Sequence, residues 1–125
     1  MGRQTLILIA DDYEDSAELL AELLRLECGY ETIAAKDGAQ ALSLALAREP
    51  LAALLDFDMP GSSGLEVAFK LREQRRGSIL LAAISGGSDL ASLASVGVFD
   101  LVFRKPLSGA DRAEFRRKID ERMRG

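Results

Sequence analysis

The sequence has one cysteine, no histidine and no long apolar run, and its acidic residues outnumber its basic ones. Cys28 is its only cysteine, so no intramolecular disulfide can form and a reducing compartment fits best. The first apolar run, residues 6–10, is too short for a signal peptide or a membrane span. The 16 basic residues are outnumbered by 20 acidic ones, which argues against direct binding of nucleic acid by the whole chain. We therefore expect a cytoplasmic protein that does not insert into membranes.

Apolar residues, in contrast, are plentiful enough for one core. They make up 48% of the 125 residues, with few aromatic residues among them. A chain of this length buries about two-thirds of its unfolded surface and needs neither disulfides nor a structural metal. The sequence has no linker, no low-complexity tract and no repeat beyond the strand–helix unit itself. Residues 1–125 are therefore expected to form a single domain.

Five short apolar runs alternate with five stretches of helical spacing. The runs are residues 6–10, 31–35, 51–55, 79–84 and 99–103. The first helical stretch ends near Gly29, and the second covers residues 39–48. The third runs from Leu65 to about Arg76, the fourth spans residues 89–95, and the fifth is the last segment of the chain. Leu65, Ala68, Phe69 and Leu71 mark the third helix, and Phe115, Ile119 and Met123 predict a buried stripe on the last one. Strict alternation predicts an α/β, doubly wound (βα)5 fold with a parallel five-stranded sheet, and we expect the flavodoxin-like order 2-1-3-4-5.

A few polar residues stand where predicted strands end. They are Asp11 and Asp12 after the first strand, Asp56 after the third, Ser85 after the fourth and Lys105 after the fifth. Ligands of doubly wound sheets bind outside the carboxyl ends of the strands. With strands one and three adjacent, the three carboxylates converge beside a hydroxyl and an ammonium group.

This combination of groups suits phosphoryl transfer. Clustered acids repel one another unless a cation lies among them, and Mg²⁺ prefers such oxygen ligands. A carboxylate such as Asp56 can act as a covalent nucleophile, while Lys105 and Ser85 would stabilise the transferred group. Each residue alone has a plainer explanation, such as a helix N-cap at Asp11 and Asp12 or a turn at Asp56.

Taken together, these segments resemble the receiver domain of bacterial two-component response regulators. The segments are Asp11-Asp12, Leu54-Leu55-Asp56-Phe57-Asp58-Met59-Pro60-Gly61-Ser62-Ser63-Gly64, Ser85 and Lys105-Pro106. Residues 29–31 and 37–42 also match the family, so the similarity covers essentially the whole chain. The resemblance implies that a sensor histidine kinase or phosphotransfer protein phosphorylates Asp56, and that the signal passes to a downstream protein target.

The resemblance also implies a role for each residue at the strand ends. Asp12, Asp56 and the backbone carbonyl of Asp58 would bind Mg²⁺, and Asp11 would reach the metal through water. Ser85 and Lys105 would contact the phosphoryl group, and the Lys105-Pro106 bond would be cis. Phosphorylation would then pull the Ser85 loop towards the site and shift the face formed by the fourth helix, the fifth strand and the fifth helix.

Two features depart from the family pattern. The family has an aromatic residue three positions before the lysine, whereas this chain has Val102 there, flanked by Phe103 and Phe99. Side chains alternate along a strand, so a neighbouring ring points the wrong way unless a bulge realigns it, and we expect the aromatic switch to be missing. Asp58 adds a fourth acid, whose side chain either alters dephosphorylation or simply faces solvent.

Other functions compete with this interpretation. A pseudo-receiver would bind partners without being phosphorylated, and the missing ring favours it slightly. The Asp-x-Asp spacing of Asp56 and Asp58 also suggests an aspartate-nucleophile phosphatase, but such enzymes place their Asp-x-Asp at the first strand. We expect no turnover enzyme here, only participation in its own phosphorylation and dephosphorylation. We expect no output domain, and we therefore expect the signal to pass by protein contact near Val102 or at residues 104–125. This last segment contains eight basic and four acidic residues. That basic excess is otherwise the solvated face of a helix.

Overall fold

The computed structural model describes residues 5–59, 64–75, 78–87 and 90–124, in which strands and helices alternate. The strands are β1 (Leu6–Ala10), β2 (Glu31–Ala35), β3 (Ala52–Asp56), β4 (Leu80–Ser85) and β5 (Leu101–Arg104). The helices are α1 (Glu14–Cys28), α2 (Gly38–Arg48), α3 (Gly64–Arg75), α4 (Leu90–Val96) and α5 (Gly109–Arg124). None of these helices is both long and apolar enough to cross a membrane.

All five strands run parallel in the order β2-β1-β3-β4-β5, which confirms the predicted topology. β1 and β3 are neighbours, with Ile9 opposite Leu54. Every residue of β3 is buried, because helices cover both faces of the sheet. The carboxyl ends of β1, β3, β4 and β5 therefore meet at one edge.

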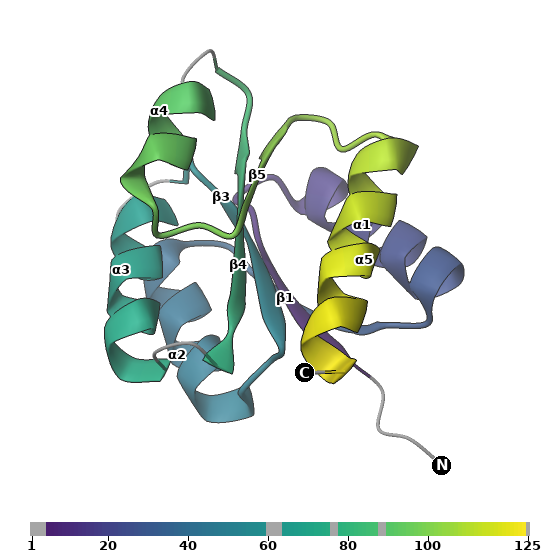
Figure 1. The fold of residues 1–125 in the computed structure, drawn as a ribbon, viewed down its shortest axis with the longest axis horizontal. Coiled ribbons are helices and arrows are strands. Elements are labelled where there is room, and N and C mark those ends of the chain that lie inside the picture. The colour runs from purple at the N-terminus through teal and green to yellow at the C-terminus, as the bar shows by residue number, and fades with distance from the viewer. Residues whose placement is uncertain (1–4, 60–63, 76–77, 88–89, 125) are drawn as a thin grey trace.

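The helices form two layers, one on each face of the sheet. Figure 1 shows α2, α3 and α4 on one side and α1 and α5 on the other. Each layer encloses its own buried cluster of apolar side chains. Leu54 and Leu55 are adjacent on β3 and belong to opposite clusters, as alternation along a strand requires.

Local sequence signals set several helix ends. α1 stops at Gly29, which has φ 73° and whose backbone N–H donates to the carbonyl of Arg25. This left-handed conformation costs glycine little and is a common way to end a helix. α2 begins after Asp37, whose side chain accepts a 2.8 Å hydrogen bond from the backbone N–H of Gln40.

Some predicted boundaries are shifted. β5 begins at Leu101 rather than residue 99, because the backbone N–H of Leu81 donates to the Asp100 carboxylate at 2.9 Å rather than to a backbone carbonyl of this segment. β4 is shifted by one residue from the predicted 79–84, so that it begins at Leu80 and includes Ser85. α4 covers Leu90–Val96, and the predicted first residue of this helix lies outside the described residues.

Two side chains predicted on apolar helix faces are exposed. Met123 is 59% exposed, so the buried stripe of α5 consists of Phe115 and Ile119 and ends a turn earlier than expected. Phe69 is 52% exposed, because α3 turns Val67, Ala68 and Leu71 towards the core and Phe69 follows one position round the helix. A helical spacing alone does not show where the covering sheet ends.

Candidate functional site

The end of β1 directs the first acidic pair to the carboxyl edge of the sheet. The backbone N–H of Asp11 donates to the carbonyl of Ala35 at 3.0 Å, which continues the pairing of β1 with β2. The side chain of Asp11 accepts a 2.9 Å bond from the N–H of Tyr13, the N-cap residue of α1. Asp11 therefore shapes the turn into the helix, whereas Asp12 is exposed next to it.

Asp56 is the last residue of β3, and its side chain has partners at both oxygens. It is 1% exposed. Oδ2 accepts a 2.7 Å hydrogen bond from the Lys105 ammonium, and Oδ1 accepts a 2.9 Å bond from the backbone N–H of Asp58. A buried carboxylate is stable in such a position only when it is paired and hydrogen-bonded, as here.

Three carboxylates converge at this edge, as the sequence predicts. Asp11, Asp12 and Asp56 each offer an oxygen, and these oxygens all lie within 4.8 Å of one another. Asp11 and Asp12 come from the end of β1, and Asp56 comes from the adjacent β3. Such a set of hard oxygen donors suits a divalent cation such as Mg²⁺.

Ser85 and Lys105 lie at the same edge, on β4 and directly after β5. The backbone N–H of Lys105 donates to the carbonyl of Ser85 at 2.9 Å, which holds the two strand ends together. Ser85 is buried, and its hydroxyl accepts a 3.2 Å bond from the N–H of Gly87. The Lys105-Pro106 peptide bond is cis, as the family resemblance implies.

The electrostatics of the cluster reflect its burial and its mixed charges. Burial raises the pKa of Asp11, with smaller opposing effects from the Tyr13 hydrogen bond and the Lys105 charge. Burial alone would lower the pKa of Lys105, but the hydrogen bond and charge of Asp56, with Asp11 and Asp58, raise it overall. Lys105 is therefore a permanent cation beside the buried carboxylate.

Asp58 contributes mainly through its backbone. Its N–H fixes one oxygen of Asp56, while the residue as a whole is exposed. This exposure agrees with the simpler of the two interpretations of its side chain. The Met59-Pro60-Gly61 part of the motif lies only partly within the described residues, which end here at residue 59.

Gly64 has a packing role that the sequence motif did not reveal. A Cβ atom at this position would lie 2.9 Å from the backbone oxygen of Asp56 and 3.3 Å from the Cα of Phe57. Side chains essentially never approach backbone so closely, so the start of α3 can lie against the acceptor loop only because residue 64 is glycine. The fixed distance from Asp56 to Gly64 in the motif was the available signal.

The structure places no aromatic ring at the expected switch position. β4 and β5 pair without a bulge, with Ala83 opposite Val102 and Ile84 opposite Phe103. Val102 packs on the cluster under α2, α3 and α4, whereas Phe103 is buried in the opposite cluster under α1 and α5. The ring of Phe103 therefore lies on the other face of the sheet from Val102, and it cannot act as the aromatic switch residue next to Ser85.

An apolar recess adjoins the charged edge. This cavity of about 130 Å³ reaches from Asp11 and Lys105 to Leu19 and Leu23 of α1 and to Leu107. Leu19 is 61% exposed at its rim. A partner that approaches Asp56 from this side would thus meet an apolar wall next to the polar site.

Fold and site together define a doubly wound α/β domain with an acidic, cation-binding type of pocket at its topological switch point. Comparison with known protein families identifies the family to which such a domain belongs. The family model for the response regulator receiver domain matches residues 7–114. The chain therefore belongs to this family and is a receiver domain of the two-component type.

Individual relatives support this assignment. The chain is 35% identical over 120 residues to the DNA-binding response regulator MtrA of Mycolicibacterium smegmatis, covering 92% of this chain and 52% of the relative. It is 32% identical over 120 residues to a protein-glutamate methylesterase/protein-glutamine glutaminase of Anaeromyxobacter dehalogenans, covering 94% of this chain and 35% of the relative. The chain thus spans about half or less of the length of these curated relatives.

Solved structures agree on the fold. A CheY-like receiver domain protein from Methanospirillum hungatei superposes with a TM-score of 0.87 at 26% identity, covering 98% of both chains. The response regulator TrrA from Thermotoga maritima, solved in complex with Mg²⁺-BeF, gives a TM-score of 0.84 at 31% identity, covering 93% of this chain and 99% of that one.

Proposed function

We propose that Asp56 accepts a phosphoryl group from the phosphohistidine of a sensor histidine kinase or phosphotransfer protein. One observation carries this proposal: a buried carboxylate lies 2.7 Å from a lysine ammonium and within 4.8 Å of two further carboxylates. A carboxylate oxygen of Asp56 would attack phosphorus, the P–N bond would break, and the imidazole would keep its electron pair and take up a proton. The product would be an acyl phosphate.

The residues present fit Mg²⁺ as the cofactor. Asp12 and Asp56 would hold it, with the backbone carbonyl of Asp58, and Asp11 would interact through water. When bound, the ion would offset the negative charge that the carboxylates present to an incoming phosphate. The donor set supports this, since all three clustered side chains offer hard oxygens.

Lys105 and Ser85 would act on the transferred group. The Lys105 ammonium already touches Asp56 and would follow the negative charge onto the phosphoryl oxygens. The Ser85 hydroxyl is one strand away and would donate to another of these oxygens. The domain would in this way assist its own phosphorylation and dephosphorylation without turning over a small substrate.

Acetyl phosphate tests the acceptor directly. Incubation with Mg²⁺ should add one phosphoryl group to the wild type by intact mass, and none to Asp56→Asn or to wild type without divalent cations. A labelled Asp56→Asn variant would disprove the acceptor assignment. An unlabelled wild type would instead favour a pseudo-receiver, the function to which the missing ring at Val102 points.

The kinase would dock on the apolar recess beside the acceptor. Its phosphohistidine must reach Asp56, and the exposed Leu19 at the recess rim offers an apolar contact there. Leu19→Asp should slow phosphotransfer from a kinase about tenfold or more, while labelling by acetyl phosphate stays normal. Leu26→Asp is the matched control, because Leu26 is 75% exposed on the same helix and does not line the recess.

For the output, we propose that residues 1–125 work as one receiver domain in the cytoplasm and signal to a downstream protein. Family membership supports this location, and the face around Val102 is a candidate contact. Without an aromatic residue there, we expect the phosphorylated state to be transmitted through the backbone of the Ser85 loop rather than by rotation of a ring.

A further inference from the structure

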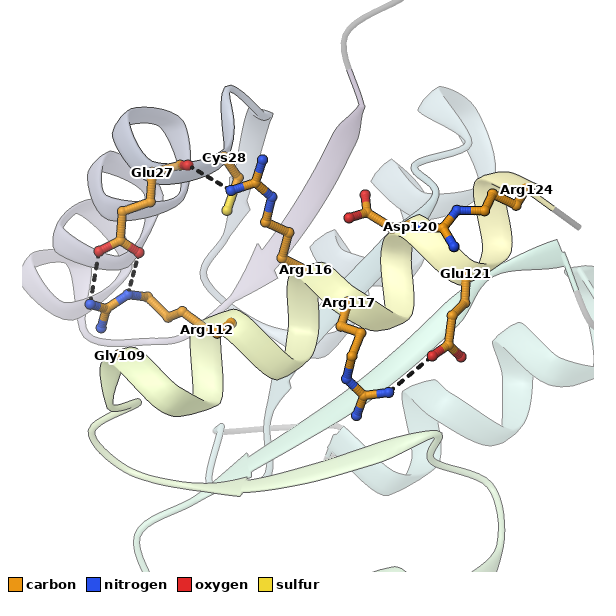
Figure 2. A pocket seen from close by; sticks show the side chains of 10 residues that line it. Glu27, Cys28, Gly109, Arg112, Arg116, Arg117, Asp120, Glu121 and Arg124 are labelled. Carbon is orange, nitrogen blue, oxygen red and sulfur yellow. Dashed lines mark hydrogen bonds and ion pairs between the residues drawn. The ribbon is translucent and has the colours of Figure 1, made fainter.

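A second feature of the surface lies between α1 and α5, outside the acidic pocket. This open groove of about 650 Å³ is lined by the last residues of α1 and by one face of α5. Figure 2 shows four arginines along it, from Arg112 near the start of the helix to Arg124 at its end. A cationic groove is unexpected on a chain whose net charge is −4.

The four arginines differ in how well they are neutralised. Arg112 forms two hydrogen bonds with the Glu27 carboxylate, at 2.7 and 3.0 Å, and Arg117 pairs with Glu121 at 2.9 Å. Arg116 donates only to the backbone carbonyl of Glu27, at 3.3 Å. Within the part of the chain that the structure describes, neither Arg116 nor Arg124 forms an ion pair. Two guanidinium groups are thus available to an external anion.

We propose that this α1–α5 groove binds an acidic segment of a partner protein, with two carboxylates about 12 Å apart that pair with Arg116 and Arg124. The two arginines are eight residues apart on α5, which gives that separation at about 1.5 Å per residue. Acids seven residues apart lie on one face of a helix, about 10.5 Å apart along its axis, and acids four residues apart on an extended chain lie about 13 Å apart, so both come close to this separation.

The charges in the groove favour a protein over other anions. Asp120 lies between Arg116 and Arg124 on the helix, so a continuous polyanion such as nucleic acid would bring a phosphate against it. A single small anion could reach only one of the two guanidinium groups. A peptide can place carboxylates at the arginines and a neutral side chain opposite Asp120.

The test uses two fluorescein-labelled, alanine-based helical peptides of 18 residues. One carries glutamates seven residues apart, and the other carries glutamines at the same positions. Fluorescence anisotropy at physiological ionic strength should show binding of the glutamate peptide and about fivefold weaker binding of the glutamine peptide. No phosphodonor is present, so the result does not depend on whether Asp56 is phosphorylated.

Matched charge variants complete the test. Arg116→Gln/Arg124→Gln should weaken binding of the glutamate peptide about fivefold. Arg48→Gln/Lys70→Gln removes the same charge from α2 and α3 on the opposite face and should leave binding unchanged. Arg124→Gln alone removes no described contact and should weaken binding severalfold, even if the Arg116 change affects folding. The proposal would be overturned if the wild type did not bind the glutamate peptide, or if both double variants lost affinity equally. It would also be overturned if inorganic phosphate or a DNA oligomer displaced the labelled peptide at a lower concentration than the unlabelled glutamate peptide does.

Discussion

At the residue scale, Asp12 is the member of the acidic cluster most open to solvent. Its carboxylate oxygen lies within 4.8 Å of oxygens of Asp11 and Asp56. Without a cation these like charges repel one another, so Asp12→Asn should raise the melting temperature measured in EDTA. With Mg²⁺ at a hundredfold excess over its dissociation constant, the wild type should gain about 2.7 kcal/mol, and the variant should gain much less.

Glu18→Gln is the control for this prediction. Glu18 is exposed on α1 and does not belong to the cluster, so the substitution removes one negative charge elsewhere. It should keep the full response to Mg²⁺ in thermal unfolding followed by circular dichroism. An identical Mg²⁺ response in Asp12→Asn and wild type would remove Asp12 from the metal site.

Gly64 gives a second prediction at this scale. Gly64→Ala would place a methyl group 2.9 Å from the Asp56 backbone oxygen, so either α3 or the acceptor strand must move. We expect a loss of about 1–3 kcal/mol in the free energy of unfolding and slower labelling of Asp56 by acetyl phosphate. Gly109→Ala also changes the first residue of a helix, but its methyl group would meet only Arg112 Nη2, at 3.7 Å. That control should be neutral or slightly stabilising in urea unfolding.

The sequence predicts the residues that form the centre of the site better than those that support it. Asp11, Asp56, Ser85 and Lys105 could be placed because strand ends of a parallel sheet meet at one edge. The steric need for Gly64 depends on the distance between two backbones, which no composition or spacing reveals. The exposure of Met123 depends on where the sheet stops covering α5, which is again a tertiary property.

At the scale of elements, a polar brace joins α3 to the entry of β5. Arg72 donates to the backbone carbonyls of Val98 and Ile79 at 3.1 and 2.8 Å and also pairs with Asp100. The Asp100 carboxylate accepts a 2.9 Å bond from the N–H of Leu81. The brace explains why β5 starts after Asp100. The sequence could not predict it, because its partners are 19 and 28 residues apart.

The contact between α1 and α5 makes stability depend on pH. The hydrogen bond from Arg112 lowers the pKa of Glu27, so the pair stabilises the fold above the ordinary carboxyl pKa. This contribution is lost as the pH falls through the lowered pKa. Glu27→Gln should therefore lower the melting temperature slightly near pH 7, and this difference should shrink as the pH falls through the lowered pKa of Glu27.

Thermal unfolding at a series of pH values measures this difference. Glu31→Gln is the control, since Glu31 and Arg48 are 4.0 Å apart and both half exposed. Its effect on the melting temperature at pH 7 should be smaller, because exposed pairs of this kind contribute little. A Glu27→Gln deficit that persists unchanged at low pH would show that packing, rather than the ion pair, holds the helices together.

At the scale of the whole molecule, topology was the most predictable property. Alternating apolar runs and helical stretches leave few arrangements open, because crossovers between parallel strands are right-handed and short. The topology does not show whether the two helix layers unfold together or separately. The sheet has a buried cluster on each face, and β3 contributes to both through Leu54 and Leu55.

Substitutions at these two positions test whether the layers unfold as one unit. Leu54→Ala and Leu55→Ala each remove a fully buried side chain, one from each cluster, and should each cost about 2–5 kcal/mol. Because the same strand supports both clusters, we expect a single cooperative transition in both variants.

Tyr30 belongs to the cluster under α1 and α5, so its fluorescence in a Tyr13→Phe background reports on that layer. In Leu55→Ala, the urea midpoint from Tyr30 fluorescence should coincide with that from far-ultraviolet circular dichroism. Separate midpoints would mean that the layer of α2, α3 and α4 can melt while that of α1 and α5 persists, and that the sheet does not couple the two faces.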